Sequence, residues 1–273
     1  KTGAAVLARQ VLLRAQGEAT ALQILGVIAL DAGDAAGARR HLEASNAARP
    51  NAATLNMIGV AAGRTGDAEG ARAAFTRAGE LGLVDGWRNL AVIEKGEAQI
   101  AAYRRALSVA PNDAASHAGL AQAREARHDI AGAKDHANAA LRGDPGNAGA
   151  RLALARVLMR EKDFVAAEAS AAPVLQAPRA LPEQRVLALG LIGDARDRRD
   201  DARGAFQAFT AANQLSLQLH GAWLNASDRL YHPDSVGRMA ERVAGLDVST
   251  WPRAEGRTPD FLAKNPSGQV PLL

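Results

Sequence analysis

The 273-residue chain contains no cysteine and few aromatic residues, which make up 4% of it. The absence of cysteine excludes disulfides and thiolate metal sites. Scarce aromatic side chains argue against a β-sandwich, whose strands draw on aromatic and β-branched residues. No apolar run reaches the roughly 20 residues that cross a bilayer. Alanine is abundant instead, and we expect helices that pack closely through small side chains.

The charge of the chain is also nearly balanced, with 33 Lys and Arg against 29 Asp and Glu, a net charge of +4. Basic and acidic residues are interleaved: Arg196, Arg198 and Arg199 alternate with Asp197 and Asp200. A nucleic-acid interface needs clustered basic residues, preferably with aromatic side chains for stacking. We therefore expect a solvated surface and no nucleic-acid partner.

The start of the chain gives no targeting signal. The first residue is Lys1 rather than Met, so we expect the natural chain to begin upstream. The first residues lack the charged-then-apolar order of a secretory leader. The expected location is the cytoplasm, with no membrane partner.

One pattern recurs at intervals of 33 or 34 residues. Gly26 and Ala38 return 33 residues later as Gly59 and Ala71. Similar spacings appear later, between Pro111 and Pro145 and among Leu189, Gly193 and Ala205. Because small and large apolar residues return together, the chain is predicted to repeat one structural unit.

Each unit contains two amphipathic helices. Leu22 and Leu25 lie on one face of the first helix, and Ala38 and Leu42 lie on one face of the second. Residues 31–34, Asp-Ala-Gly-Asp, form a turn that ends the first helix and caps the second. A single hairpin cannot bury its apolar stripe, so stability is expected to come from stacked neighbours.

The recurring pattern resembles the tetratricopeptide repeat (TPR). The residues that carry the resemblance are Leu22, Leu25, Gly26, Ala29, Ala38, Leu42 and Pro50, then Leu55, Ile58, Gly59, Ala62, Ala71, Phe75 and Ala78, with weaker copies downstream. The resemblance implies an all-α fold, a right-handed α-solenoid. About five to six hairpins would fill residues 1–215, the first one partial. We expect capping helices over 216–248 and a linker with an irregular tail over 249–273.

Two segments depart from the repeat. The hairpin that begins near Trp87 is about one helical turn short. Residues 171–182 contain three prolines and are predicted to form a longer, kinked connection.

The resemblance also implies a binding surface, because the first helix of each TPR hairpin lines a concave groove. Polar residues predicted to face this groove are Gln23, Asn56, Arg88, Asn89, Gln122, Arg156 and Arg160. Amide and guanidinium groups there would bind the backbone and carboxylates of an extended peptide. The alternative is that they only solvate an unused surface. The expected function is a protein–protein interaction scaffold with a protein or peptide ligand; self-association through the solenoid ends is a third hypothesis.

Two shorter resemblances concern the C-terminal part. Residues 205–213 are similar to the last repeat of proteins that join a TPR array to a sulfotransferase domain. This implies that the chain is the N-terminal arm of a larger, bacterial-type protein. Residues 257–273 resemble a glutathione transferase segment in which Pro271 would be the cis-proline and the Val270 backbone would pair with glutathione. The sequence lacks the loop with which sulfotransferases bind the 5′-phosphosulfate of the sulfate donor. It also lacks the βα unit that precedes this segment in glutathione transferases. The alternative function is therefore part of a transferase whose catalytic domain is missing.

No catalytic, cofactor or metal site is predicted in the residues present. Phosphate-binding glycine loops and H-E-x-x-H are missing from the sequence. His128 and His136 are eight residues apart, a helical rise of about 12 Å, and cannot share a metal. Asp113 and Glu125 are read as turn or solvent-facing carboxylates rather than an acid–base pair. We therefore expect a non-enzymatic protein without a cofactor.

Overall fold

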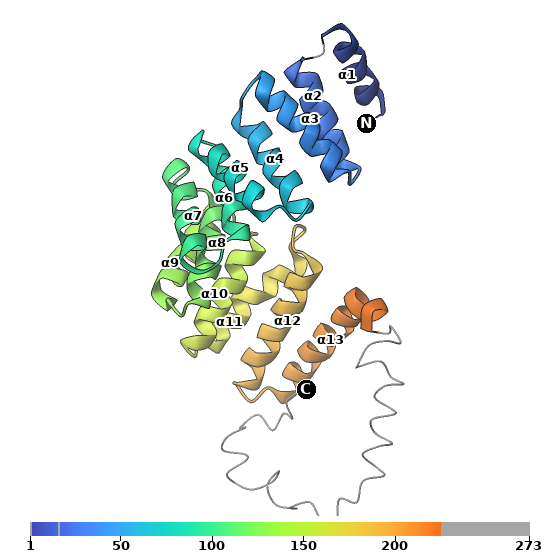
Figure 1. Ribbon diagram of the computed structural model, residues 1–273. Coiled ribbons are helices and arrows are strands. Elements are labelled where there is room, and N and C mark those ends of the chain that lie inside the picture. The colour runs from blue at the N-terminus through green and yellow to red at the C-terminus, as the bar shows by residue number, and fades with distance from the viewer. Residues whose placement is uncertain (1, 16, 225–273) are drawn as a thin grey trace, which may run out of the picture. The chain divides into compact units, whose positions relative to one another are not determined.

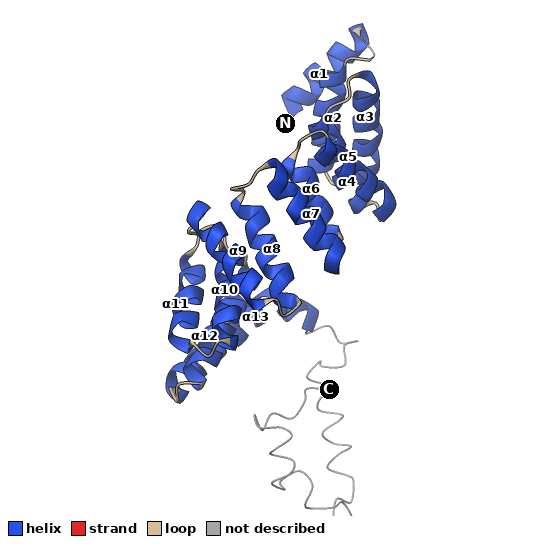
Figure 2. Cartoon of the chain, turned by 90° about the vertical axis from the view of Figure 1, so that its left-hand side faces the viewer, coloured by secondary structure: helices blue, strands red, loops and turns tan. Residues whose placement is uncertain are grey.

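The computed structural model describes residues 2–15 and 17–224, which are all helix or connecting loop (Figures 1 and 2). The chain divides into two compact units, Lys1–Ser216 and Leu217–Leu273, and the second is described only as far as residue 224. The prediction of an all-α fold is confirmed. In the described part of the chain, the helices are too short or too polar to cross a membrane.

The described helices form one leading helix and a series of hairpins (Figure 1). The leading helix is α1 (Thr2–Arg14). The hairpins are α2 (Ala19–Asp31) with α3 (Ala35–Ala48), α4 (Ala52–Arg64) with α5 (Ala68–Glu80), α6 (Val84–Ile93) with α7 (Gly96–Val109), α8 (Ala114–Ala126) with α9 (Ile130–Gly143), α10 (Ala148–Arg160) with α11 (Phe164–Ala171), and α12 (Pro182–Asp197) with α13 (Ala202–Leu224). Each second helix from α3 to α11 also packs against the first helix of the next hairpin.

In five of the described hairpins the turn contains a residue with positive φ followed by an Asp N-cap, whereas α7 begins after Lys95. Gly33 has φ +82° and precedes Asp34, whose carboxylate accepts the Gly37 N–H at 2.7 Å. The carboxylate satisfies an N–H that the start of α3 would otherwise leave unpaired. The predicted role of residues 31–34 is confirmed.

Inside the hairpins, large side chains of second helices cover glycines of first helices. A methyl group on Gly59 would lie 2.5 Å from the Phe75 ring, and one on Gly26 would lie 2.5 Å from Leu42. Phe209 covers Gly193 in the same way. These repeated glycines therefore let a large residue reach the neighbouring backbone.

The two predicted departures both occur. Helix α6 has 10 residues, whereas α2, α4, α8 and α10 have 13 each. After α11 the chain turns into a short 3₁₀ helix, Ala172–Gln176, and α12 begins only at Pro182. Pro173, in the first turn of the 3₁₀ helix, lacks a backbone donor and so interrupts the regular α-helix. Pro182 is the first residue of α12, where the missing N–H would be unpaired in any case.

The expected boundary at residue 215 lies inside a helix. Helix α13 runs without interruption over Ala202–Leu224 and crosses that boundary. Between Ala205 and Leu219 there is neither Gly nor Pro to end it. The remainder of the expected capping helices and the tail lie outside the described residues.

Candidate protein-interaction surface

The seven residues predicted to line a groove all lie on first helices, but at different positions. Gln23, Asn56 and Arg88 each stand five residues after the N-cap of their helix. Gln122 and Arg156 stand nine residues after it. These positions are one helical turn apart and share a helix face.

The other two predicted residues are Arg160 and Asn89. Arg160 lies one helical turn beyond Arg156, thirteen residues after the N-cap of α10. Asn89 lies six residues after the N-cap of α6, next to the shared face. First helices also contact one another, in the series α2–α4–α6 and α8–α10–α12.

Two of the predicted residues bind each other. The Asn89 Nδ2 donates to Asn56 Oδ1 at 2.8 Å, which joins α6 to α4. Both side chains are half-buried. Since each carboxamide carries two donor hydrogens and an acceptor oxygen, the pair retains unused hydrogen-bonding groups.

Arg88 links the third hairpin to the fourth. Its Nη1 donates to both carboxylate oxygens of Asp113, the N-cap of α8, at 3.2 and 3.3 Å, and its Nη2 pairs with Asp85. Burial would raise the pKa of Asp113, but hydrogen bonds from Ser116 and the charge of Arg88 outweigh burial and the pKa is lowered. The guanidinium of Arg88 is thus largely occupied within the protein.

Arg160 also has a partner within the protein, the carboxylate of Glu125. Glu125 was expected to face solvent, but this expectation is wrong: the residue lies near the end of α8 and is only 7% exposed. The Arg160 Nε and Nη2 donate to its Oε1 at 3.2 and 2.9 Å. A buried carboxylate requires such a partner. The 35-residue separation, close to one repeat, is the signal that points to this pair.

The other three predicted residues are uncommitted. Within the described residues, Gln23, Gln122 and Arg156 make no side-chain hydrogen bond or ion pair. Gln122 is exposed, and Gln23 and Arg156 are half-buried. Their donors and acceptors are therefore available to a ligand.

Sequence reasoning missed a set of valines on the same face. Val27, Val60 and Val92 stand nine residues after the N-caps of α2, α4 and α6, the position that Gln122 and Arg156 occupy in later hairpins. Val27 is 38% and Val92 is 71% exposed. Val27 and Val60 are 33 residues apart but Val92 follows after 32, so counting from each N-cap aligns all three.

We call this surface the first-helix face. It consists of Gln23, Val27, Asn56, Val60, Arg88, Asn89, Val92, Gln122, Arg156 and Arg160. It presents amides beside valines in the first three hairpins, and an amide and two guanidinium groups in the fourth and fifth. Over the described residues, no three His, Cys, Asp or Glu side chains are grouped to hold a metal.

Comparison with known proteins bears on the repeat and the fold. Residues 124–189 match the family model described as "Tetratricopeptide repeat". A comparison with curated proteins gave no match.

Many solved structures resemble the chain, among them the following three. The C-terminal part of a TPR repeat-containing protein from Cytophaga hutchinsonii has a TM-score of 0.58 at 13% identity, covering 77% of this chain and 88% of that one. The APC/C hetero-tetramer Cut9–Hcn1 has a TM-score of 0.55 at 15% identity, covering 77% of this chain and 46% of that one. A TPR protein from Parabacteroides merdae has a TM-score of 0.51 at 17% identity, covering 72% and 93%. The described helices thus have the fold of a tetratricopeptide-repeat solenoid.

Proposed function

We propose that the protein is a protein–protein interaction scaffold whose first-helix face binds an extended segment of a partner polypeptide. The observation that carries this proposal is the uncommitted set Gln23, Gln122 and Arg156 on one face. A primary amide both donates and accepts, so it matches the backbone N–H and C=O of an extended peptide. Arginine adds a charge-assisted bond to a carboxylate.

The exposed valines favour a peptide over a purely polar ligand. Val27 and Val92 offer apolar contact beside the amides, and burial of such side chains contributes about 25 cal/mol per Å². A partner with aliphatic side chains at the first three hairpins and carboxylates at Arg156 would match the face.

The comparisons support binding as the general role. TPR domains typically bind proteins or peptides, and residues 124–189 match that family's model. One structure of similar fold, Cut9–Hcn1, is itself a hetero-tetramer. These similarities support the fold and the general role in binding. The chemistry of the proposed partner is inferred only from the residues of the first-helix face.

The other expectations stay predictions. The sulfotransferase resemblance falls on residues 205–213, which form part of α13. The glutathione transferase resemblance, residues 257–273, lies outside the described residues. A cytoplasmic location and self-association are likewise untested.

The test is a capture experiment with matched triple variants. The first variant combines Gln23→Ala, Gln122→Ala and Arg156→Ala. The control combines Gln10→Ala, Asn138→Ala and Arg40→Ala, which removes the same chemical groups from exposed positions on α1, α9 and α3. Far-UV circular dichroism would first establish that both variants keep the helical fold.

Polypeptides that the wild-type protein retains from a lysate would be identified by mass spectrometry. We expect the first variant to lose them and the control to keep them. Equal retention by both variants would contradict the proposed surface.

A further inference from the structure

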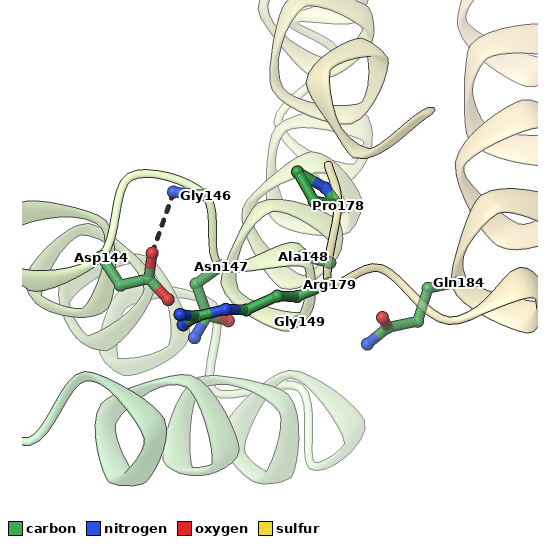
Figure 3. Close-up of a pocket in the computed structure, with 8 residues that line it drawn as sticks. All are labelled: Asp144, Gly146, Asn147, Ala148, Gly149, Pro178, Arg179 and Gln184. Atoms are coloured by element: carbon green, nitrogen blue, oxygen red, sulfur yellow. Dashed lines mark hydrogen bonds between the residues drawn. The ribbon is translucent and has the colours of Figure 1, made fainter. Parts of the chain in front are cut away.

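An open cavity of about 500 Å³, with several polar side chains on its walls, lies between the fifth and sixth hairpins (Figure 3). One side is the turn before α10 and the start of that helix, with Asp144, Asn147 and Gly149. The other side is the loop before α12 and its first turn, with Arg179 and Gln184. The cavity occurs where the 3₁₀ helix and the following loop replace the short connections found between most other hairpins. It is therefore a consequence of the break in the repeat.

Two carboxamides in the cavity have their oxygens occupied. Asn147 Oδ1 accepts the Ala150 N–H at 3.0 Å, and Gln184 Oε1 accepts the Leu181 N–H at 2.9 Å. Each oxygen thereby caps the start of a helix. The amide nitrogens, which only donate, are left without a partner among the described residues.

A guanidinium group adds further donors. The Arg179 side chain extends across the cavity toward Asn147 (Figure 3). It makes no hydrogen bond or ion pair with the described residues. The acceptor nearby is the carboxylate of Asp144, whose Oδ1 receives the Gly146 N–H at 3.1 Å. Donors therefore exceed acceptors in this cavity.

The cavity adjoins the first-helix face. A methyl group on Gly149 would collide with the Nε2 of Gln122, so this amide of the face lies against the cavity wall. A chain bound at Gln122 therefore lies close to Gly149, on the α10 side of the cavity.

We propose that this cavity binds a carboxylate group of the partner polypeptide, an inference that rests on the proposed function. The guanidinium of Arg179 forms the charge-assisted bonds, and the nitrogens of Gln184 and Asn147 donate to the same group. The negative charge of Asp144 repels a dianion such as a phosphate monoester more strongly than a carboxylate, which favours a single carboxylate. The cavity recognises a feature of the partner that the amides of the first-helix face do not.

The test uses three short probes and the full chain. The first is the acetylated, amidated peptide Gly-Ser-Glu-Ser-Gly, and the second replaces Glu by Gln. The third, acetyl-Gly-Ser-Gly-Ser-Gly with a free C-terminus, separates a chain-end carboxylate from a side-chain one. Binding would be followed by the NMR signals of the Arg179 Nε–H and of the Asn147 and Gln184 side-chain amides.

We expect at least one carboxylate probe to shift these signals and the Gln probe to leave them unchanged. Arg179→Gln should weaken that probe roughly tenfold or more, as loss of a charge-assisted bond implies. The control Arg40→Gln makes the same charge change at an exposed site on α3 and should bind as the wild type does.

Failure of both carboxylate probes, or equal shifts with the Gln probe, would overturn the inference. So would unchanged affinity in Arg179→Gln. The capture experiment alters none of the cavity-lining residues, so its outcome judges the proposed function separately.

Discussion

At the scale of single residues, the glycines under aromatic rings give the sharpest prediction. A methyl group on Gly59 would lie 2.5 Å from the buried ring of Phe75, whereas one on Gly63, in the same helix, meets nothing within 4 Å. We expect Gly59→Ala to lower the free energy of unfolding by about 1–3 kcal/mol through overpacking. Gly63→Ala should raise it by up to about 1 kcal/mol through better helix propensity. Urea denaturation followed by circular dichroism would measure both, and equal effects would contradict the packing.

Another residue-scale feature is a histidine pair that sequence spacing did not reveal. The Nδ1 atoms of His117 on α8 and His136 on α9 are 2.9 Å apart, and the Nε2 of His117 lies 3.0 Å from the Pro111 carbonyl oxygen. If His117 donates Nε2–H to that carbonyl, its neutral ring accepts the proton of His136. At this separation one proton lies between the two Nδ1 atoms, so the pair disfavours the binding of a second proton there.

The histidine pair predicts a pH dependence of stability. Burial lowers the pKa of His136, and the charges of His117, Arg124 and Arg104 lower it further, against Asp135. The unfolded chain therefore binds this proton more readily, so the free energy of unfolding should decrease as pH falls below about 6.5. Carboxyl groups whose pKa is lowered in the folded protein change the free energy of unfolding only at a pH more acidic than the range in which histidine titrates.

Urea denaturation at several pH values between about 5 and 7.5 would measure this slope around the ordinary histidine pKa. The control is His136→Gln, which removes the titrating group and should flatten the slope. An unchanged slope in the variant would refute the assignment.

At the scale of the element, the turn between two helices of a hairpin repeats with different residues. The residue before the Asp N-cap has positive φ in five hairpins, as Gly33 and Gly66 in the first two and as His128, Lys162 and Asp200 in later ones. Glycine adopts this conformation without strain, whereas other residues pay about 1 kcal/mol.

The turn therefore predicts opposite effects at equivalent sites. Lys162→Gly should raise the free energy of unfolding by up to about 1 kcal/mol, and Gly66→Ala should lower it by about 1–2 kcal/mol. Thermal melting of both variants beside the wild type would check this. Stabilisation by Gly66→Ala would contradict the backbone conformation.

At the scale of the whole molecule, neighbouring hairpins supply one another's core. Leu120 of α8 is 1% exposed because it packs with Ile100, Tyr103 and Leu107 of α7. A hairpin removed from its neighbours would expose such residues to water.

We therefore expect a peptide of residues 113–143, the fourth hairpin alone, to have little helical signal near neutral pH. A fragment of residues 83–197, which adds a hairpin before it and the following α10, α11 and α12, should be largely helical, because stacking supplies the stability. Circular dichroism at 222 nm would compare them. A helical isolated hairpin would show that stacking is not required.

Many helices and turns of this protein could be predicted from the amino-acid sequence alone. The recurrence of Gly26 and Gly59, the Asp that caps most second helices, the short third hairpin and the break near Pro173 are local patterns, and local patterns determine helices and turns. The candidate surface was predicted as a set of residues, all of which lie on first helices.

Contacts between hairpins were decided only by the tertiary structure. Helix α5 has 13 residues where α3 has 14, so α6 begins one residue early relative to a 33-residue repeat. Asn56 and Asn89 are therefore 33 residues apart yet lie at different positions of their helices, where they bind each other. Glu125 became buried because Arg160 of the next hairpin neutralises it. Sequence periodicity records which face of a helix is apolar, whereas the pairing of polar side chains across hairpins depends on how far each helix is shifted along its neighbour. That shift exists only after the hairpins have stacked.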